Sequence, residues 1–593
     1  MAAPPQTFRI AGIVVDEINR APLARARVSI TCNCKDKPLV ESVQTDGEGH
    51  FAFENLQSGK YSLSAERRGY GTQSFQQHEW FSTSIVVGTA ADSEHILFGL
   101  LPQAAISGQV TDDATGPVRD AEIVLFRKSR GAGKTQIQME ATQRTDDQGR
   151  YRFAGLRAGT YYVGVNTRPW YAQFAVPLMH FELKGPNGEN LDLNIREESS
   201  TGVVSSTFVS AGGSAQGFSI MQSGGGLAEL RAATNAAEAA AISVNASETL
   251  QEPSPLEVVY PLTYFQDATD AAAAAAIALR PGDSEIADFN LHAIPAVRMR
   301  IRTHKGGSES EDQVGAPQVE YAQRGLGNYA ARIPTEAVQI EPGIMEVSGL
   351  PPGPLAITVA GGQSNVDAGR TTEFDASGEA ASIAIRRTLQ FEDGTPLQAQ
   401  ADIALRDRAS GALLMSATSK DGTMVFHSPA GIAAAYDVLL VNSEGLAVKS
   451  MSASGAKTSG QTVEITGTQD VQLTITISKT SASINGVALR EGKPLAGVMI
   501  LLVPVDSEHK LSLFRQAQSD SDGTFSLSDV MAGKYTAVAI ENGWELDWAD
   551  ARVLASYLAS GERLDVAAER SYDVKVQVVA AKTSGASTAG SSP

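Results

Sequence analysis

Hydrophobic and polar positions alternate along much of the chain, and one alternating phrase recurs. The clearest copy is TDDQGRYRFAGLRAGTYYVGV. After Gly149 come aromatic residues at +2 and +4, an aliphatic residue at +7, glycine at +10 and tyrosine at +12. Such alternation predicts strands with one buried and one solvated face. The phrase recurs after Gly49 and Gly523, in weaker form after Gly343, and in degenerate form after Gly422.

Each part of the phrase has a structural interpretation. The Asp/Ser/Gly cluster before the first glycine predicts a β-turn, since glycine accepts positive φ and aspartate bonds the turn backbone. The LxxGxY segment resembles a tyrosine corner, in which the hydroxyl bonds the backbone a few residues upstream. The candidates for this role are Tyr61, Tyr161 and Tyr535. The phrase therefore predicts a turn, a strand, a corner and the next strand.

The recurrence predicts an all-β protein, a tandem array of Greek-key Ig-like or prealbumin-like β-sandwiches. The linkers look short, so we expect an elongated rod. The predicted units are 7–102, 103–295, 296–378, 379–480 and 481–580, followed by a disordered tail at 581–593. Residues of low complexity at about 199–257, with a helix-like run, predict an insertion into the second unit, and such long loops are functional or disordered.

Charge and composition narrow the partners. The chain has 593 residues and a formal net charge of −19, with 42% hydrophobic and 19% charged residues. An acidic balance repels nucleic acid and anionic lipid, so neither is expected as a partner. No apolar run approaches the ~18–20 residues of a membrane span. The first residues, MAAPPQTFRI, lack a signal-peptide pattern, which leaves open another route or a removed leader.

Two cysteines, Cys32 and Cys34, stand in TCNCKD. A bridge between them would close a small, strained ring. The expected state is therefore two reduced thiols, with oxidation and a two-cysteine metal site left open.

Motifs for catalysis are absent from the sequence. None of the eight histidines has a glutamate three residues later, and HExxH and GxSxG do not occur. GAGKT at Gly131–Thr135 lacks the first glycine of a phosphate loop, since Lys128 occupies that position, and a hairpin is predicted instead. The Asp-rich turns lack the ligand spacing of a calcium loop. We therefore expect no catalytic residue, no cofactor and no metal site.

The repeated unit resembles the carboxypeptidase regulatory-like domain, a prealbumin-like sandwich. The layout is similar to multi-domain secreted proteins of soil bacteria, notably acidobacteria, through RPWYAQF (from Arg168), YPLTYFQDATDAAAAAAIALRPGDSEIADFNL (from Tyr260) and WELDWADARVLASYLASGERLDV (from Trp544). The resemblance implies an accessory module without assigned chemistry. It also implies an extracellular, cell-surface or periplasmic location.

Prealbumin-like sandwiches also resemble starch-binding modules, where exposed aromatic rings stack on sugars. The candidate ligand-binding residues are Trp170, Tyr171, Tyr260, Tyr264, Trp544 and Trp548. The alternative is that these rings fill domain ends or the seams between domains.

Three functions are weighed. The preferred one is a non-catalytic extracytoplasmic structural, adhesion or scaffold protein, which binds protein partners or itself and assembles through strand donation at open sheet edges. The insertion or the tail would then be the donor strand. The alternative is a carbohydrate-binding accessory protein with a polysaccharide partner. The third is a hydrolase whose site is built across domains.

Overall fold

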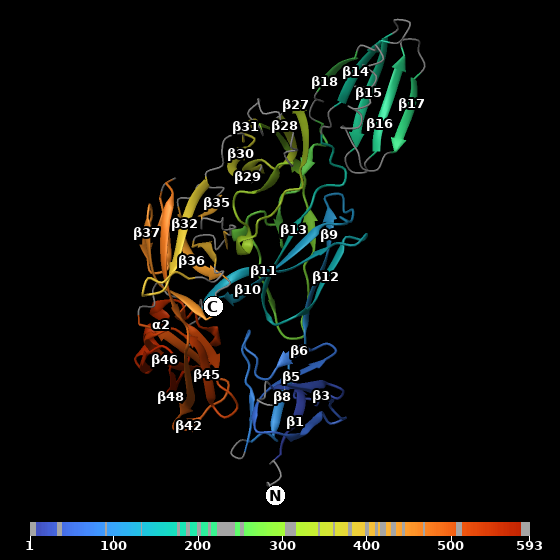
Figure 1. The fold of residues 1–593 in the computed structure, drawn as a ribbon. Coiled ribbons are helices and arrows are strands. Elements are labelled where there is room, and N and C mark those ends of the chain that lie inside the picture. Colours follow the sequence, from blue (N-terminus) through green and yellow to red (C-terminus); the bar gives the residue numbers. More distant parts are fainter. Residues whose placement is uncertain are drawn as a thin grey trace, which may run out of the picture.

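Strands dominate the computed structural model of the chain, and the helices among the described residues are short (Figure 1). The tandem all-β architecture predicted from the repeats is confirmed. The structure describes residues 7–32, 38–88, 92–131, 133–174, 178–184, 190–198, 203–210, 215–221, 244–249, 254–302, 316–341, 344–359, 362–376, 382–397, 402–408, 413–414, 423–427, 434–441, 445–466, 469–505 and 513–582. Gly343, Gly422, Cys34 and most of the predicted tail lie outside these residues.

The first sandwich packs a β4-β1-β8 sheet on a β3-β2-β5-β6 sheet, and β7 pairs with β5. Its buried core joins Val14 and Phe98 from one sheet to Val28 and Leu63 from the other. The alternation read from the sequence therefore directs one face of each strand inward. The strands are β1 (Phe8–Asp16), β2 (Arg27–Cys32), β3 (Leu39–Gln44), β4 (His50–Leu56), β5 (Gly59–Arg67), β6 (Gly71–Ser74), β7 (Ile85–Val87) and β8 (Ile96–Leu100).

The second sandwich combines a β11-β10-β13-β20 sheet, with β21 also on β13, and a β12-β9-β22 sheet, with β23 also on β9. Strands before and after the low-complexity segment thus share both sheets. The Ala run begins with the 3-10 helix η1 (Ala271–Ala273). The strands are β9 (Ala104–Asp112), β10 (Glu122–Gly131), β11 (Lys134–Arg144), β12 (Arg150–Leu156), β13 (Gly159–Asn166), β20 (Thr263–Tyr264), β21 (Ile277–Leu279), β22 (Ser284–Ile286) and β23 (Phe289–Leu291).

The segment between β13 and β20 contains a separate antiparallel sheet of order β17-β16-β15-β14-β18. It includes β14 and β15, which precede the predicted start of the insertion at Ser199. The Gln173 N–H donates to Leu256 O at 3.0 Å, so the two ends of the segment lie side by side. The helix-like run falls outside the described residues. The strands are β14 (Leu178–Lys184), β15 (Asn190–Glu198), β16 (Val203–Ser210), β17 (Ala215–Met221), β18 (Val244–Thr249) and the β19 (Val258–Val259) and β24 (Ile294–Pro295) pair.

The two degenerate repeats also form paired sheets. Residues 297–375 give sheets of order β27-β28-β25-β31 and β26-β29-β30. These strands are β25 (Val297–Arg302), β26 (Gln318–Tyr321), β27 (Glu336–Glu341), β28 (Ile344–Leu350), β29 (Gly353–Val359), β30 (Gly362–Ala368) and β31 (Glu373–Asp375), with the 3-10 helix η2 (Leu326–Asn328).

Residues 382–479 give sheets of order β35-β32-β40-β37 and β34-β33-β36-β39-β38. Their core includes Ile385 and Leu473 from the first sheet and Leu405 and Val463 from the second. The strands are β32 (Ser382–Gln390), β33 (Asp402–Asp407), β34 (Leu413–Leu414), β35 (Thr423–His427), β36 (Ala434–Val441), β37 (Leu446–Ser454), β38 (Lys457–Ser459), β39 (Thr462–Ile465) and β40 (Val471–Lys479).

The last sandwich is one continuous sheet of order β42-β41-β48-β46-β43-β44, with β45 on β41 and β47 on β46. Helix α2 (Ala551–Leu558) begins after Asp550, whose carboxylate accepts from the Arg552 N–H at 2.9 Å. The strands are β41 (Ala482–Arg490), β42 (Lys493–Pro494), β43 (Met499–Pro504), β44 (Arg515–Gln518), β45 (Thr524–Val530), β46 (Gly533–Glu541), β47 (Glu562–Val566) and β48 (Ser571–Ala580), and η4 (Gly543–Glu545) is a 3-10 helix.

The repeated phrase forms a turn and a tyrosine corner. Tyr61 Oη donates to Gln57 O at 2.9 Å, and Tyr161 Oη donates to Arg157 O at 2.8 Å, each four residues upstream. Tyr535 is buried at the equivalent place. In each turn the first glycine has positive φ, for example 70° at Gly149. The recurring letters therefore serve folding.

The chain does not extend as the predicted rod. The last sandwich returns to the first, where Lys60 pairs with Asp520, and to the second, where Arg130 pairs with Glu545 (Figure 1). Short linkers restrict only neighbouring units, whereas these contacts join residues more than four hundred positions apart. Ion pairs between charged side chains of separate sandwiches therefore fold the array back on itself.

Candidate functional site

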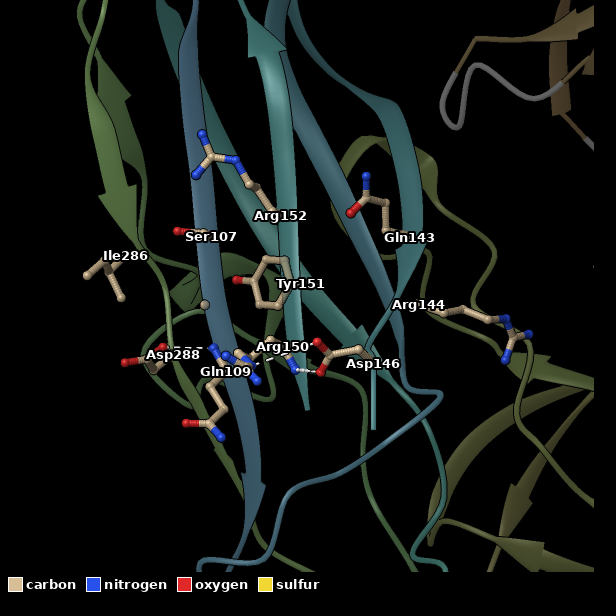
Figure 2. Close-up of a pocket in the computed structure, with 11 residues that line it drawn as sticks. Ser107, Gln109, Gln143, Arg144, Asp146, Arg150, Tyr151, Arg152, Ile286 and Asp288 are labelled. Atoms are coloured by element: carbon tan, nitrogen blue, oxygen red, sulfur yellow. Dashed lines mark hydrogen bonds and ion pairs between the residues drawn. The ribbon is translucent and has the colours of Figure 1, made fainter. Parts of the chain in front are cut away.

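An open groove of ≈ 640 Å³ lies on the second sandwich, over β9, β12, β22 and the end of β11 (Figure 2). Gly108 at its floor is required, because a Cβ there would stand 2.0 Å from Ala287 O. Tyr151 Oη donates to the same carbonyl at 2.5 Å. Burial, together with the negative charge of Asp288, raises the pKa of Tyr151. This hydroxyl is therefore a structural donor and stays protonated.

One ion pair joins two charged residues of the groove, and a carboxylate there accepts from the backbone. Arg150 lies 3.8 Å from Asp146, and Asp288 Oδ1 accepts from the Gln109 N–H at 2.8 Å. The lining residues are Ser107, Gly108, Gln109, Gln143, Arg144, Asp146, Arg150, Tyr151, Arg152, Ile286 and Asp288. They include neither histidine nor cysteine, and no nucleophile among them hydrogen-bonds to a base. The groove is a polar surface and lacks the arrangement of an acyl-transfer site.

Four of the six aromatic candidates lie in the second sandwich, and the structure separates them. Trp170 is 79% exposed, and its ring meets Tyr171 edge-on at 5.8 Å between centroids. Tyr260 and Tyr264 are 3% and 1% exposed. Tyr264 Oη accepts from the Leu326 N–H at 3.3 Å, which ties the second sandwich to the third. Buried rings offer no free face to a sugar, so only Trp170 and the partly buried Tyr171 keep that possibility.

The other two candidates lie in a segment that we call the connector, Gly543–Asp550. Trp544 stacks on His78 of the first sandwich, with centroids 4.8 Å apart and planes 5° apart. Trp548 packs on Phe514 at 5.2 Å and covers Gly133 in the second sandwich. Both rings thus fill seams between domains, which is the alternative weighed from the sequence. Stacking on a sugar would require those domains to separate.

The connector also holds the tip of the β10–β11 hairpin. Asp547 Oδ1 accepts from the Thr135 N–H at 2.9 Å and from its hydroxyl at 2.6 Å. Arg130 pairs with Glu545 at 2.5 Å. A Cβ on Gly133 would stand 2.4 Å from the Trp548 ring, so only glycine fits. The GAGKT segment is the predicted hairpin, and the features that suggested phosphate serve docking between domains.

A second contact joins the first and last sandwiches. The docking turn, Ser519–Thr524, meets what we call the receiving edge, formed by Lys60 and Ser84–Val86. Lys60 Nζ lies 2.5 Å from Asp520 Oδ2. The Ser84 and Val86 N–H groups donate to Asp520 Oδ1 and Ser521 Oγ at 3.2 and 2.8 Å. The turn is therefore held by a charge pair and by strand-edge hydrogen bonds.

His78 and Trp80 were not singled out from the sequence. His78 Nδ1 lies 3.1 Å from Gln518 Oε1, and burial lowers the pKa of His78. The Gln518 amide donates to Gln76 O and Thr83 Oγ1, so its oxygen accepts and His78 Nδ1 carries the proton. Trp80 is 92% exposed at the turn between His78 and Phe81. The segment that contains them, HEWF from His78, matches no motif that would have identified either residue as a candidate.

Cys32 is disulfide-bonded, so the expectation of a reduced thiol at this position is wrong. The spacing argument against a bridge assumed a strand that continues through both cysteines, but β2 ends at Cys32. Within the residues that the structure describes, no group of three or more His, Cys, Asp or Glu side chains is placed to hold a metal. None of the described helices has the length and apolar character needed to cross a bilayer.

Solved structures similar to this chain include pilins. The shaft pilin SpaA from Lactobacillus rhamnosus GG is 12% identical over 29% of this chain and 91% of its own, with a TM-score of 0.15. The Streptococcal ancillary pilin is 10% identical over 60% and 90%, with a TM-score of 0.18. GBS52, the minor pilin of Streptococcus agalactiae, is 10% identical over 51% and 99%, also at 0.18. These scores are too low to support an inference about function.

Sequence comparison gives a family for part of the chain. No curated protein matches it. The family model of the carboxypeptidase regulatory-like domain matches residues 9–90 and 105–196. The first match reaches from β1 to β7, and the second covers β9 to β14 and most of β15. The resemblance read from the repeats is confirmed for these two segments. The chain thus contains two segments similar to the carboxypeptidase regulatory-like domain, set in an array of β-sandwiches.

Proposed function

We propose that this chain is a non-catalytic structural protein, a scaffold of β-sandwiches that works outside the cytoplasm. One observation carries the proposal. The segments that stood apart from the repeat and suggested chemistry, GAGKT and the connector, contact each other and hold domains together through Asp547, Thr135 and Trp548. Residues used in this way build a fixed arrangement of domains.

The disulfide at Cys32 supports the location. Disulfides form and persist in oxidising compartments, such as the periplasm and the cell surface, and are rare in the cytosol. The acidic net charge of −19 agrees with a soluble protein that avoids nucleic acid.

The proposal is tested on the purified full chain and on the producing cells. We expect no turnover in a broad panel of peptide, ester, glycoside and phosphate substrates. We also expect a membrane-impermeant amine reagent to label the protein in intact cells. Turnover that survives further purification, or labelling only after the cells are lysed, would contradict the proposal.

A second candidate function, carbohydrate binding, is favoured by the exposed Trp170 with Tyr171 beside it. Affinity electrophoresis in polysaccharide gels tests it, with Trp170→Ala against Trp80→Ala as the matched control, since both rings are exposed. Retardation that Trp170→Ala abolishes and Trp80→Ala keeps would support binding. Equal mobility of all three proteins with and without polysaccharide would exclude it for the sugars tested.

Assembly through strand donation stays part of the proposal. Within the predicted insertion, β16, β17 and β18 are already paired in their own sheet, and the remaining candidate donors, 222–243 and 583–593, lie outside the described residues. Removing residues 583–593 should abolish filaments seen by electron microscopy if the tail is the donor. Filaments that persist would exclude the tail.

A further inference from the structure

The same turn occurs in three sandwiches, but its first aspartate caps the turn in two of them and contacts another domain in the third. In the first sandwich Asp46 Oδ1 accepts from the Glu48 and His50 N–H groups at 2.9 and 2.8 Å, which caps its own turn. In the second sandwich Asp146 does the same. In the last sandwich Asp520 instead binds Lys60 and the Ser84 N–H of another domain. A turn that folds one domain can therefore also dock on another.

The change at Asp520 has a visible local cause. Asp522 accepts from the Thr524 N–H at 3.0 Å and from its hydroxyl at 2.6 Å, so it takes over the capping of the turn. The backbone of the turn is unchanged, because Gly523 N–H still donates to Asp520 O at 2.8 Å, as Gly49 N–H does to Asp46 O at 3.2 Å. The three turns thus present the same backbone to a partner.

The receiving edge is present twice. In the first sandwich it consists of Lys60 on β5 and the outer side of β7, where Tyr61 pairs with Ile85. In the last sandwich Gly-Lys-Tyr recurs on β46, and Tyr535 pairs with Leu564 of β47. Lys534 therefore stands where Lys60 stands. Arg563 and Asp565 take the places of Ser84 and Val86, with their N–H groups toward the outer side of β47.

This second edge is open, at least within the described residues. Lys534, Arg563 and Asp565 are exposed, and no described side chain pairs with either cation. β47 is hydrogen-bonded to β46 alone. The second sandwich lacks such an edge, since Thr160 replaces the lysine.

We propose that the Thr45–His50 turn of one copy of this chain docks on the Lys534 edge of a second copy. The turn is exposed at its tip and acidic, with Asp46 and Glu48, whereas the edge carries two cations, Lys534 and Arg563, and one carboxylate, Asp565. Asp46 Oδ1 caps its own turn, and Oδ2 lies 3.4 Å from His50 Nδ1 at the surface, where an incoming lysine replaces the histidine. Gly47 keeps the N–H that, in Ser521, donates to Ser84 O at 2.9 Å.

The contact joins unlike surfaces at the first and last sandwiches, so it is a head-to-tail contact. Such heterologous contacts give rings when the rotation closes and open chains when it does not. Each copy keeps its internal contact between Asp520 and Lys60, because the proposed one uses the free turn and the free edge. The inference rests on the proposed scaffold function, to which it adds the partner.

Charge reversal with complementation tests the contact on the full chain, by sedimentation velocity over a series of concentrations. We expect wild type to form species beyond the dimer, and Asp46→Lys or Lys534→Glu alone to raise the apparent Kd by about tenfold or more. An equimolar mixture of the two variants should also regain longer species, because the intact turn meets the intact edge at one junction and the two reversed charges meet at the next. The double variant should regain longer species.

Lys575→Glu is the matched control, since Lys575 is exposed on β48 of the same sandwich and should leave assembly unchanged. Circular dichroism establishes that each variant is folded. Wild type that stays monomeric at every concentration, or single variants that assemble like wild type, would overturn the inference. Those results leave the scaffold proposal standing, whereas turnover of a substrate would overturn the scaffold and not the contact.

Discussion

At the scale of single residues, the recurring tyrosine and the recurring threonine or serine hold each repeat together. Thr45 Oγ1 accepts from the Ala26 N–H at 2.8 Å and donates to Leu23 O at 2.7 Å. Thr145 makes the same two bonds to Ala121 and Val118. Ser519 does so with Val498 and Leu495. One buried hydroxyl thus ties the turn to the preceding loop in all three.

Tyr61→Phe should destabilise the first sandwich by about 1 kcal/mol, because Gln57 O loses its partner while the ring stays packed. Hydrogen exchange of β5, converted to a free energy of opening, measures the loss. Tyr161→Phe should act likewise on the second sandwich. Tyr162→Phe is the control, since successive side chains on a strand point to opposite faces. Equal effects at 161 and 162 would contradict the role of the corner.

Acid should weaken the contact between the first and last sandwiches. Burial lowers the pKa of His78 in the docked state, whereas a solvated histidine has a pKa of about 6.5. The separated state therefore binds more protons, and the stability of the contact is lost as the pH falls through about 6.5. Gln518, Trp544 and Glu545 face the ring, and the Glu545 charge opposes the shift without reversing it.

Protection of the Ser84 and Val86 amides from hydrogen exchange measures this contact, because both donate to the docking turn. Their protection should fall between pH 7.5 and pH 5.5 after correction for the intrinsic rate. His78→Gln should remove that pH dependence. A fall that is identical in wild type and variant would show that another group controls the contact.

At the scale of elements, alternation predicted strands such as β12 and β40 well, because one face of each is buried and the other solvated. β43 is buried on both faces and shows no such alternation. The hairpin at Gly131–Thr135 was also predictable, since the residues after GAGKT have a strand-like pattern. The insertion was predicted but its sheet was not, because β16 and β18 mix serine and threonine with valine and carry little apolar contrast. The exposure of the aromatic candidates was not predictable for a related reason. The sequence identifies a large ring but does not say whether a neighbouring domain covers it, as His78 covers Trp544.

Replacing residues 175–254 by a short Gly/Ser linker should leave the second sandwich folded. The Gln173 N–H bonds Leu256 O, so the cut ends are already adjacent, and β13 pairs with β20 and β21 without the insertion. Hydrogen exchange of β9, β10 and β13 should keep its protection. Loss of protection in these strands, with the first sandwich unaffected, would mean that the separate sheet supports this core.

At the scale of the whole molecule, the array folds back because the last sandwich contacts both the first and the second. Trp544 reaches the first and Trp548 the second, from one connector of eight residues. Contacts of this kind could not be predicted from the sequence, because no local pattern indicates that Lys60 and Asp520, 460 positions apart, form an ion pair. Linker length limits where neighbours lie and says nothing about distant domains.

Lys60→Glu should loosen this arrangement by on the order of 1 kcal/mol, since it replaces an attraction to Asp520 by a repulsion. Small-angle scattering should report a larger radius of gyration, and Asp520→Lys should do the same. The double variant restores the pair and should return to the wild-type value. A single variant with unchanged scattering would mean that the connector alone keeps the domains together.

The split use of the Asp46 and Asp520 turns has an evolutionary consequence. Because Asp522 caps the Thr524 N–H and leaves Asp520 to bind Lys60, a repeat can form a joint to a distant module without a new loop or strand. Each duplication of such a unit therefore adds another turn of this kind, which a substitution can convert into a contact with a distant domain. Arrays built in this way can change their shape faster than their fold.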